Sequence, residues 1–359
     1  MSRFVFVLGA GASAAGGAPV ASNFMEKAKQ LQRNADLGGK DKDAFDLVFR
    51  ARDALKAVHS KANLDLANLE VLFNAFEMAA LFNRLGPLSE EEVQRLPDAM
   101  RRVIARTIEE NLIFHVDQRT TINARLLPPT PYGEFADLLI KLSGNRGWHD
   151  TCVITFNYDL GIDCALGSHG ISYGYGLDDK ASGGLNLLKL HGSLNWHQCP
   201  QCQEIVPWPL DDYLQKHQWK FLPGGSEAKL EVSLRVPQFG HCGPPLIVEP
   251  TIVPPTWNKG THYAQLKRVW RLAAKHLSEA EYIFIIGYSY PPTDEFFKYL
   301  YALGSIGEGW LEHIYVFNPD DKVGRRIGEL LGPLAKEKYN ARTNRFDQAI
   351  SVIEALNLS

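Results

Sequence analysis

The chain opens with an apolar, strand-like run that leads directly into a glycine-rich turn. Residues Phe4–Leu8 are all apolar, and the next five residues read Gly-Ala-Gly-Ala-Ser. Glycines at such a junction let backbone amides approach a ligand closely, and a helix that begins there attracts an anion. The same glycines also suit a plain tight turn from strand to helix, so this motif alone leaves nucleotide binding open.

Length and composition narrow the class of protein. The 359 residues, 45% of them apolar and 22% charged, can bury a large core and predict one large domain or two. A net charge of −3 gives no basic footprint, so no direct nucleic-acid binding is expected. No window reaches the roughly 18 apolar residues of a membrane span. Gly9 and Gly11 interrupt the first run, so neither a signal peptide nor a membrane partner is expected.

Short apolar runs, separated by long helical stretches, predict an α/β fold with a Rossmann-like parallel sheet and crossover helices. In such sheets, ligands bind beyond the carboxyl ends of the strands. The runs expected as strands are Phe4–Leu8, Cys152–Phe156, Leu187–Leu190, Tyr282–Ile286 and Ile314–Phe317.

Two insertions interrupt this pattern within a single domain spanning residues 1–359. Residues 22–149 predict a large helical insertion, with helices over Phe45–Val58, Leu69–Leu85 and Val93–Asp117. Residues 197–249 predict a small, loop-rich module that contains a CxxC motif. An apolar stripe in the helical insertion is expected to be core rather than a cofactor site, and it consists of Leu72, Phe73, Phe76, Met78, Leu81 and Phe82.

Polar residues gather where the predicted strands end. Asn157 and Asp159 follow the second strand, His191 follows the third, and Ser289 and Asn318 follow the last two. Each has an ordinary reading, because Asn and Asp commonly cap helices and a single histidine is often structural. Their recurrence at successive strand ends is what favours a shared site.

Taken in order, the motifs Gly-Ala-Gly-Ala-Ser, Thr-Phe-Asn-Tyr-Asp, Leu-His-Gly-Ser, Gly-Tyr-Ser and Phe-Asn-Pro resemble those of the sirtuin superfamily. They are most similar to the bacterial sirtuin-like branch of NAD+ hydrolases in anti-phage defence. The resemblance covers residues 4–21, 151–196, 246–259 and 282–320, and it leaves the helical insertion outside. It implies a sheet of the sirtuin type and NAD+ as the substrate.

The resemblance also implies roles for individual residues. Asn157 and Asp159 would lie near the nicotinamide and its ribose, and His191 would act as a general base on the ribose side. Asn157 would orient a water molecule through its carbonyl oxygen. The remaining positions would bind the rest of NAD+: Gly9, Ala10, Gly11 and Ser13 at the pyrophosphate, Gly287 and Ser289 at the adenosine-side phosphate and ribose, and Asn318 at the adenosine ribose.

The residues after the first glycine loop differ from those of deacetylase sirtuins, and this difference favours one of the possible reactions over the others. Deacetylase sirtuins carry Gly-Ile-Pro-Asp-Phe-Arg after the first loop, whereas here Gly17-Ala18-Pro19 is followed by Val20-Ala21-Ser22. This favours a NAD+ glycohydrolase that releases nicotinamide and ADP-ribose over a protein deacylase or an ADP-ribosyltransferase. A non-catalytic subunit that binds NAD+ or ADP-ribose is a third alternative, although a pure binder has no need of His191.

The cysteines indicate a metal site. Five cysteines, two of them in Cys199-Pro-Gln-Cys202, favour a reducing cytoplasm and metal binding over disulfides. Sirtuins add a second CxxC, but here the corresponding region has His241-Cys242. A structural zinc on Cys199, Cys202, Cys242 and His241 is predicted in a zinc-ribbon-like module. His197 is the alternative fourth ligand, because adjacent residues are hard to fit around one ion, and a knuckle without metal is the other reading.

The resemblance implies further properties of the protein. It predicts a cytoplasmic effector that depletes NAD+ and is restrained by homo-oligomer formation or by a separately encoded sensor, such as a HerA-type ATPase or an Argonaute-like protein. The segment Pro250–Lys259 would form a wall of the nicotinamide pocket or a purely structural crossing. The pairs Arg101-Arg102 and Arg325-Arg326 are most simply solvated helix faces, and contact with a partner is the alternative.

Overall fold

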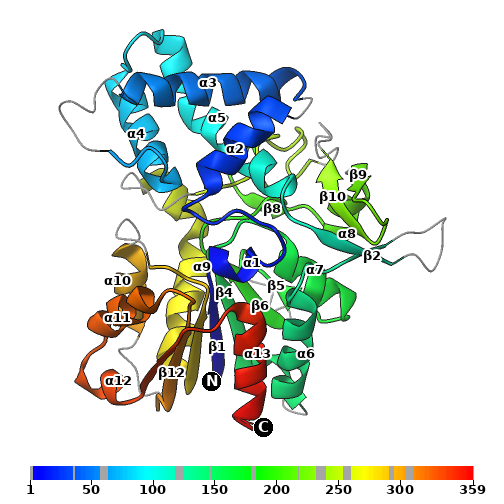
Figure 1. Ribbon diagram of the computed structural model, residues 1–359, viewed down its shortest axis with the longest axis vertical. Coiled ribbons are helices and arrows are strands. Elements are labelled where there is room, and N and C mark those ends of the chain that lie inside the picture. The colour runs from blue at the N-terminus through cyan, green and yellow to red at the C-terminus, as the bar shows by residue number, and fades with distance from the viewer. Residues whose placement is uncertain are drawn as a thin grey trace.

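A parallel sheet organises the chain, and every run predicted as a strand contributes to it (Figure 1). The computed structural model describes residues 3–34, 37–56, 64–117, 125–144, 147–178, 183–216, 218–231, 240–253, 260–290, 295–304 and 310–358. Across the sheet the strands are β13 (Tyr339–Arg342), β12 (His313–Phe317), β11 (Tyr282–Ile286), β1 (Phe4–Leu8), β4 (Thr151–Thr155), β6 (Leu185–Lys189) and β5 (Tyr173–Gly174).

The first strand lies in the middle of this sheet and is buried on both faces. It pairs in parallel with β11 on one side and β4 on the other. Side chains alternate along a strand, so Phe4 and Phe6 reach one face while Val5 and Val7 reach the other. Helices cover both faces, which is why a parallel strand can be apolar throughout.

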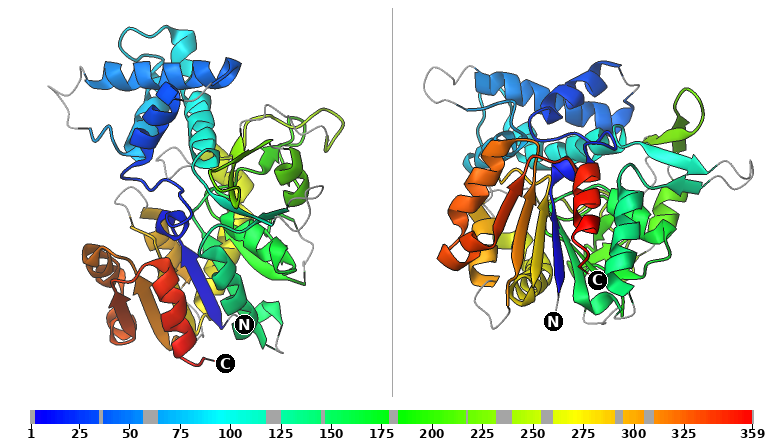
Figure 2. Two further views of the ribbon diagram at one scale, coloured as in Figure 1. Left: turned by 45° about the vertical axis from the view of Figure 1, so that its right-hand side comes forward. Right: turned by 60° about the horizontal axis from the view of Figure 1, so that its bottom comes forward.

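The covering helices divide between the two faces (Figure 2). The face of Phe4 and Phe6 carries α6 (Tyr132–Ser143), α7 (Gly161–Ser168) and α13 (Phe346–Ala355). The opposite face carries α9 (Gly260–Glu279), α10 (Glu295–Gly304) and α11 (Asp321–Leu330). The shorter helices are α1 (Ala10–Ser13), η2 (Trp148–Asp150) and α12 (Pro333–Glu337). The predicted α/β fold with a Rossmann-like parallel sheet is confirmed.

A separate helical layer stands beyond the carboxyl ends of the strands (Figure 1). It consists of α2 (Phe24–Asn34), α3 (Gly39–Lys56), α4 (Leu69–Phe82) and α5 (Glu90–Glu109). Asn68 caps α4, and Ser89 forms a capping box with Glu92 at the start of α5.

The apolar stripe of α4 is core only over its first turns. Leu72, Phe73 and Phe76 are buried, but Leu81 is 62% exposed and Phe82 is 67% exposed. The prediction that these last two residues are core is therefore wrong. The helix ends at Asn83, whose left-handed backbone closes it, and the helical period places Leu81 and Phe82 away from the face of Leu72, Phe73 and Phe76.

The helix predicted over Val93–Asp117 also ends early. Its last helical residue is Glu109, and Phe114–Asp117 forms a strand instead. This strand, β2, joins a second sheet in the order β3 (Arg125–Leu127), β2, β10 (Glu227–Glu231) and β9 (Gln218–Phe221). Because β2 comes from residues 22–149 and β10 from residues 197–249, the two insertions share one antiparallel sheet.

The small module also contains α8 (Leu210–Lys216) and the hairpin of β7 (Trp196–Gln198) and β8 (Ile205–Pro207). Trp208 and Tyr213 from this module are buried in the same core as the helical layer. Within the described residues, no helix is both long and apolar enough to cross a membrane.

Candidate functional site

The glycine-rich loop after β1 crosses the loop after β11 backbone to backbone. Gly9 N donates to Ile286 O at 3.0 Å, and Gly11 N donates to Gly287 O at 2.9 Å. A Cβ on Gly9 would lie 2.4 Å from Tyr288 Cα, and one on Gly11 would lie 2.8 Å from Gly287 Cα. Gly287 itself has φ +63°, which favours glycine. Each of the two loops therefore needs glycine where the backbone of the other loop passes close to it.

Four buried polar side chains meet beside this loop, and we call them the Ser13 cluster: Ser13, Tyr132, Asn157 and Asp159. Ser13 ends α1, Tyr132 begins α6, and the other two follow β4. Ser13 Oγ lies 2.6 Å from Asp159 Oδ2, 2.8 Å from the Tyr132 hydroxyl and 3.0 Å from Asn157 Nδ2. The structure thus brings three predicted site residues together, while the predicted role of Ser13 at a pyrophosphate stays a prediction.

The hydrogen bonds of Asn157 determine which way its amide points. The Gly9 carbonyl can only accept, and it lies 2.9 Å from Asn157 Nδ2. The second Nδ2 proton goes to Ser13 Oγ. Both protons face the protein, so the side-chain carbonyl oxygen is the atom that remains for a ligand or a water.

Burial raises the pKa of Asp159, against the opposing effect of the Ser13 hydroxyl and the Lys189 charge. Its other oxygen accepts a hydrogen bond from Gly161 N at 2.9 Å. Burial, reinforced by the charge of Asp159, also holds the pKa of Tyr132 well above its usual value. Tyr132 therefore remains a hydrogen-bond donor at any physiological pH.

His191 follows β6 and lies against the aromatic residues that flank Asn157. Its buried ring lies 5.0 Å from that of Phe156 and 6.1 Å from that of Tyr158. Its carbonyl accepts from Val253 N at 2.8 Å. At the next residue, Gly192, a Cβ would lie 2.0 Å from Thr251 O.

A crossing segment, Glu249–Val253, therefore holds the His191 turn from one side. This corresponds to the start of the predicted pocket wall Pro250–Lys259, of which residues 254–259 lie outside the described part of the chain.

Two arginines of α5 hold the same segment from its other side. Arg101 Nε donates to Ile252 O at 3.3 Å, and Arg102 bridges Glu249 Oε1 at 2.9 Å and Asp41 Oδ1 at 2.7 Å. Both arginine side chains are only 13% exposed. The prediction of a solvated Arg101-Arg102 face is wrong, because these charges link the helical layer to the crossing segment.

Sequence reasoning missed a fully buried ion pair below the site. Lys189 Nζ bonds to Asp163 Oδ2 at 2.8 Å, and both side chains are 0% exposed. The same ammonium group donates to Asp159 O at 2.7 Å and to Ser193 Oγ at 2.8 Å. It therefore joins the loops after β4 and β6. A lysine at the end of an otherwise apolar strand was the available signal.

The adenosine-side candidates lie at the ends of β11 and β12. Asn318 Nδ2 donates to Tyr288 O at 3.2 Å, and Asn318 Oδ1 accepts from Asp320 N at 3.0 Å. Ser289 is exposed, and its carbonyl accepts from Arg326 at 2.9 Å. Arg326 is therefore not simply part of a solvated face. These bonds tie the two turns together beside Gly287.

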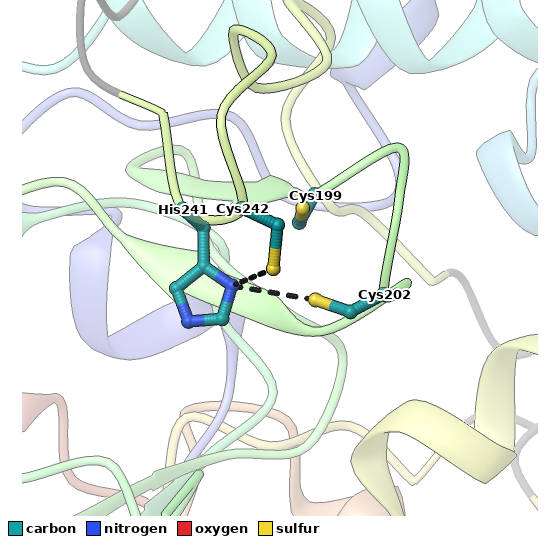
Figure 3. A group of neighbouring side chains, drawn as sticks. All are labelled: Cys199, Cys202, His241 and Cys242. Carbon is teal, nitrogen blue, oxygen red and sulfur yellow. Dashed lines mark hydrogen bonds between the residues drawn. The ribbon is translucent and has the colours of Figure 1, made fainter.

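The predicted metal ligands Cys199, Cys202, His241 and Cys242 form the Cys–His cluster (Figure 3). Their ligand atoms lie within 4.8 Å of one another. His241 Nδ1 lies 3.3 Å from the sulfurs of both Cys202 and Cys242. Adjacent His241 and Cys242 are expected from the sequence to be hard to fit around one ion, but the turn that carries them directs both side chains into the cluster.

The donor set fits a zinc ion. Tetrahedral zinc–sulfur bonds of about 2.3 Å place ligand atoms about 3.8 Å apart. In this cluster, the imidazole nitrogen lies 3.3 Å from two of the sulfurs, and all the ligand atoms lie within 4.8 Å of one another. The Cys202 backbone amide lowers the pKa of Cys199 to about 6, which favours the thiolate that a metal binds. His241 Nε2 lies 3.6 Å from Glu204 Oε2, an outer contact typical of metal-bound imidazoles. His197, the alternative ligand, instead donates from Nδ1 to Ile247 O at 2.9 Å.

The two other cysteines have no such role. Cys152 and Cys164 are buried, as predicted for small apolar residues. Burial raises the pKa of Cys152 far above its usual value and that of Cys164 to about 12. Neither thiol is poised to act as a nucleophile.

The chain is similar in fold to solved structures of Sir2 homologues. No family model matches the chain, and a search of curated proteins found no match. Among solved structures, the chain is similar to a Sir2 homologue in complex with NAD, at 17% identity over 99% of this chain and 91% of that chain, with a TM-score of 0.43. It is also similar to a mutant Sir2 homologue in complex with ADP-ribose, at 17% identity over 99% and 94% of the two chains, with a TM-score of 0.44.

Proposed function

We propose that the chain is a NAD+ glycohydrolase, which cleaves NAD+ to nicotinamide and ADP-ribose. One observation carries the proposal: the oriented amide of Asn157 and the imidazole of His191 follow adjacent parallel strands, beside the glycine loop after β1. Ligands of open α/β sheets bind at such a strand edge. The ordered motifs that resemble those of sirtuin-like NAD+ hydrolases supply the identity of the ligand.

The chemistry follows from NAD+ itself. Nicotinamide is a good leaving group, so the glycosidic bond breaks through a positively charged, oxocarbenium-like ribose. Asn157 Oδ1 accepts a hydrogen bond from a water and orients its oxygen toward the anomeric carbon. The carbon–oxygen bond forms, and nicotinamide leaves with the electron pair of the broken carbon–nitrogen bond. His191 takes the proton that the water loses, either directly or through a ribose hydroxyl that gives its own proton to His191 and accepts the proton of the water.

Hydrolysis is favoured over transfer to a protein acceptor for two reasons. The Asp-Phe-Arg element of deacetylase sirtuins is absent after Pro19. In addition, the helical layer stands beyond the carboxyl ends of the strands, where an acceptor peptide would have to approach (Figure 1). Water needs no such approach path.

The test is to incubate purified protein with NAD+ and measure free nicotinamide and ADP-ribose. We expect Asn157→Ala and His191→Ala to abolish release, while the exposed control variants Asn340→Ala and His149→Ala retain it. Activity that survives both site substitutions would refute the assignment. Nicotinamide release only with an acylated peptide would indicate a deacylase, and ADP-ribose binding without turnover would indicate a binding subunit.

The biological role that we propose is depletion of cytoplasmic NAD+ in an infected bacterial cell. Unrestrained cleavage would kill the host, so restraint by homo-oligomer formation or by a separately encoded sensor, such as a HerA-type ATPase or an Argonaute-like protein, belongs to the proposal. The test is to challenge expressing cells with phage and measure NAD+. A constant NAD+ level with every candidate partner would refute this role while leaving the chemistry intact.

A further inference from the structure

We infer that Tyr132 is a positioning residue for NAD+ cleavage: its hydroxyl fixes Ser13 and, through Ser13, the amide of Asn157. Its kinetic consequence rests on the proposed function. Its structural consequence, the fixed orientation of the Asn157 amide, does not.

The number of protons available in the Ser13 cluster determines which group donates and which accepts each hydrogen bond. Ser13 Oγ has a single proton, which it donates to Asp159 Oδ2 at 2.6 Å. The Tyr132 hydroxyl, 2.8 Å away, must then donate to Ser13 rather than accept from it. Asn157 donates the third bond. With one proton donated and two accepted, the Ser13 hydroxyl is saturated and its orientation is unique.

Packing gives the Tyr132 hydroxyl a fixed place. The side chain is fully buried, and its ring meets that of Phe346 edge to face at 5.5 Å. On the other side, a Cβ on Gly161 would lie 2.7 Å from Tyr132 Cε2. The ring is therefore held between α7 and α13, and its hydroxyl cannot leave Ser13 without displacing these helices.

Without the Tyr132 hydroxyl, the Ser13 hydroxyl and the Asn157 amide are held by fewer hydrogen bonds. Ser13 Oγ loses one of its two donors, so its torsion is set by Asp159 and Asn157 alone. Asn157 Nδ2 also loses its longer contact with the Tyr132 hydroxyl at 3.5 Å. The amide is then held less firmly, and its carbonyl oxygen is aimed at the water in a smaller fraction of molecules.

The kinetic test compares Tyr132→Phe with Tyr213→Phe. Tyr213 is an equally buried tyrosine whose hydroxyl donates to Glu109 in the helical core. We expect Tyr132→Phe to lower kcat about tenfold with KM for NAD+ within twofold, because one buried hydrogen bond is lost and substrate contacts are unchanged. Tyr213→Phe should leave both constants within twofold. An unchanged kcat, or a raised KM alone, would overturn the inference.

A second readout needs no activity. With ¹⁵N-labelled asparagine, the Asn157 side-chain NH2 signal is identified by its loss in Asn157→Ala, and its proton exchange with water is measured. Exchange should be slow in the parent and in Tyr213→Phe, and faster in Tyr132→Phe. Should Tyr132→Phe fail to fold, Ser13→Ala carries the same expectation. Fast exchange in the parent, or slow exchange in all variants, would refute the positioning role. A parent that releases no nicotinamide but shows the expected exchange would refute only the proposed function.

Discussion

The Ser13 cluster and the Cys–His cluster are assembled in opposite ways. Ser13 bonds to residues 119 and 146 positions away, and all four members are buried. The Cys–His cluster joins two turns only 39 positions apart, and three of its four members are exposed. The sheet builds the first cluster, whereas local turns build the second.

The two clusters also differ in how their charges are balanced. In the Ser13 cluster, each donor meets an acceptor of the protein, so only the carbonyl oxygen of Asn157 is left for a ligand or a water. In the Cys–His cluster, the hydrogen bond to Cys202 raises the pKa of Cys242 to about 11, so the Cys242 thiol keeps its proton until a metal cation displaces it. Damage to one cluster should therefore leave the other working.

Reversing the hydrogen bonding of Asn157 should have the largest effect. In the parent protein, the Gly9 carbonyl oxygen accepts a hydrogen bond from Asn157 Nδ2 at 2.9 Å. In Asn157→Asp, a carboxylate oxygen replaces this donor and repels the carbonyl oxygen. Nicotinamide release should fall by about 10²–10³, as when other preorganised polar groups are removed. Zinc content should not change. The control is the exposed Asn340→Asp, and a site variant that keeps a tenth of the parent activity would contradict the assigned amide orientation.

The buried ion pair should matter most for stability. Lys189→Met leaves Asp163 without its partner in a site where both are 0% exposed, and it should cost about 3–5 kcal/mol of unfolding free energy, measured in urea. Adding Asp163→Asn should recover part of this loss. The surface pair of Lys141 and Glu354 is the control, because solvent screens this exposed pair and Lys141→Met should leave the unfolding free energy nearly unchanged. Equal losses for the two lysines would contradict the assignment.

A buried histidine should make the sheet sensitive to acid. Burial lowers the pKa of His276 to about 4, and Asn186 lies 3.1 Å from its Nε2. The folded protein keeps this group neutral, while the unfolded chain takes up a proton below about pH 6.5. Stability is therefore present above pH 6.5 and is lost, by about 3 kcal/mol, as the pH falls to 4. Urea unfolding of His276→Gln should lack this loss, and an unchanged pH dependence would refute it.

Removing the metal should have the smallest effect on NAD+ cleavage. Cys202→Ser should abolish the binding of about one zinc per chain, measured by atomic absorption. The rate of nicotinamide release should stay within about threefold, because the Ser13 cluster shares no ligand with the Cys–His cluster. Ser168→Ala, in a residue whose hydroxyl bonds to Ala165 O of its own helix and lies beside His169 Nδ1, serves as the control. A large loss of activity on zinc removal would show that the clusters are coupled.

The same contrast explains what the sequence could predict. The bounds of β1 and β11 match the predicted runs, because a strand buried on both faces must be continuously apolar. The metal ligands were also predictable, since short spacings record local turns. The proximity of Asn157 and His191 was predictable because the ends of parallel strands meet at one edge of a sheet, whereas their roles stay a prediction.

Other features depended on contacts between distant residues. Tyr132 looked like any tyrosine at the start of a helix, since its partners lie more than a hundred residues away. The strand pairing of β2 with β10 likewise joins distant insertions through a short strand that continued the helical pattern of α5. Leu81 and Phe82 are exposed because the helical period turns them away from the face that carries Leu72, Phe73 and Phe76, which apolarity alone did not reveal.

The crossing segment Glu249–Val253 connects the helical layer to His191, the proposed base. Arg101 and Arg102 grip one side of the segment, and the other side bonds to the His191 turn. A rotation of α5 would therefore reach the imidazole through two side chains and a stretch of backbone. If His191 is the base of the proposed reaction, a substitution that tilts α5 should lower the rate of nicotinamide release, although it lies at no strand end.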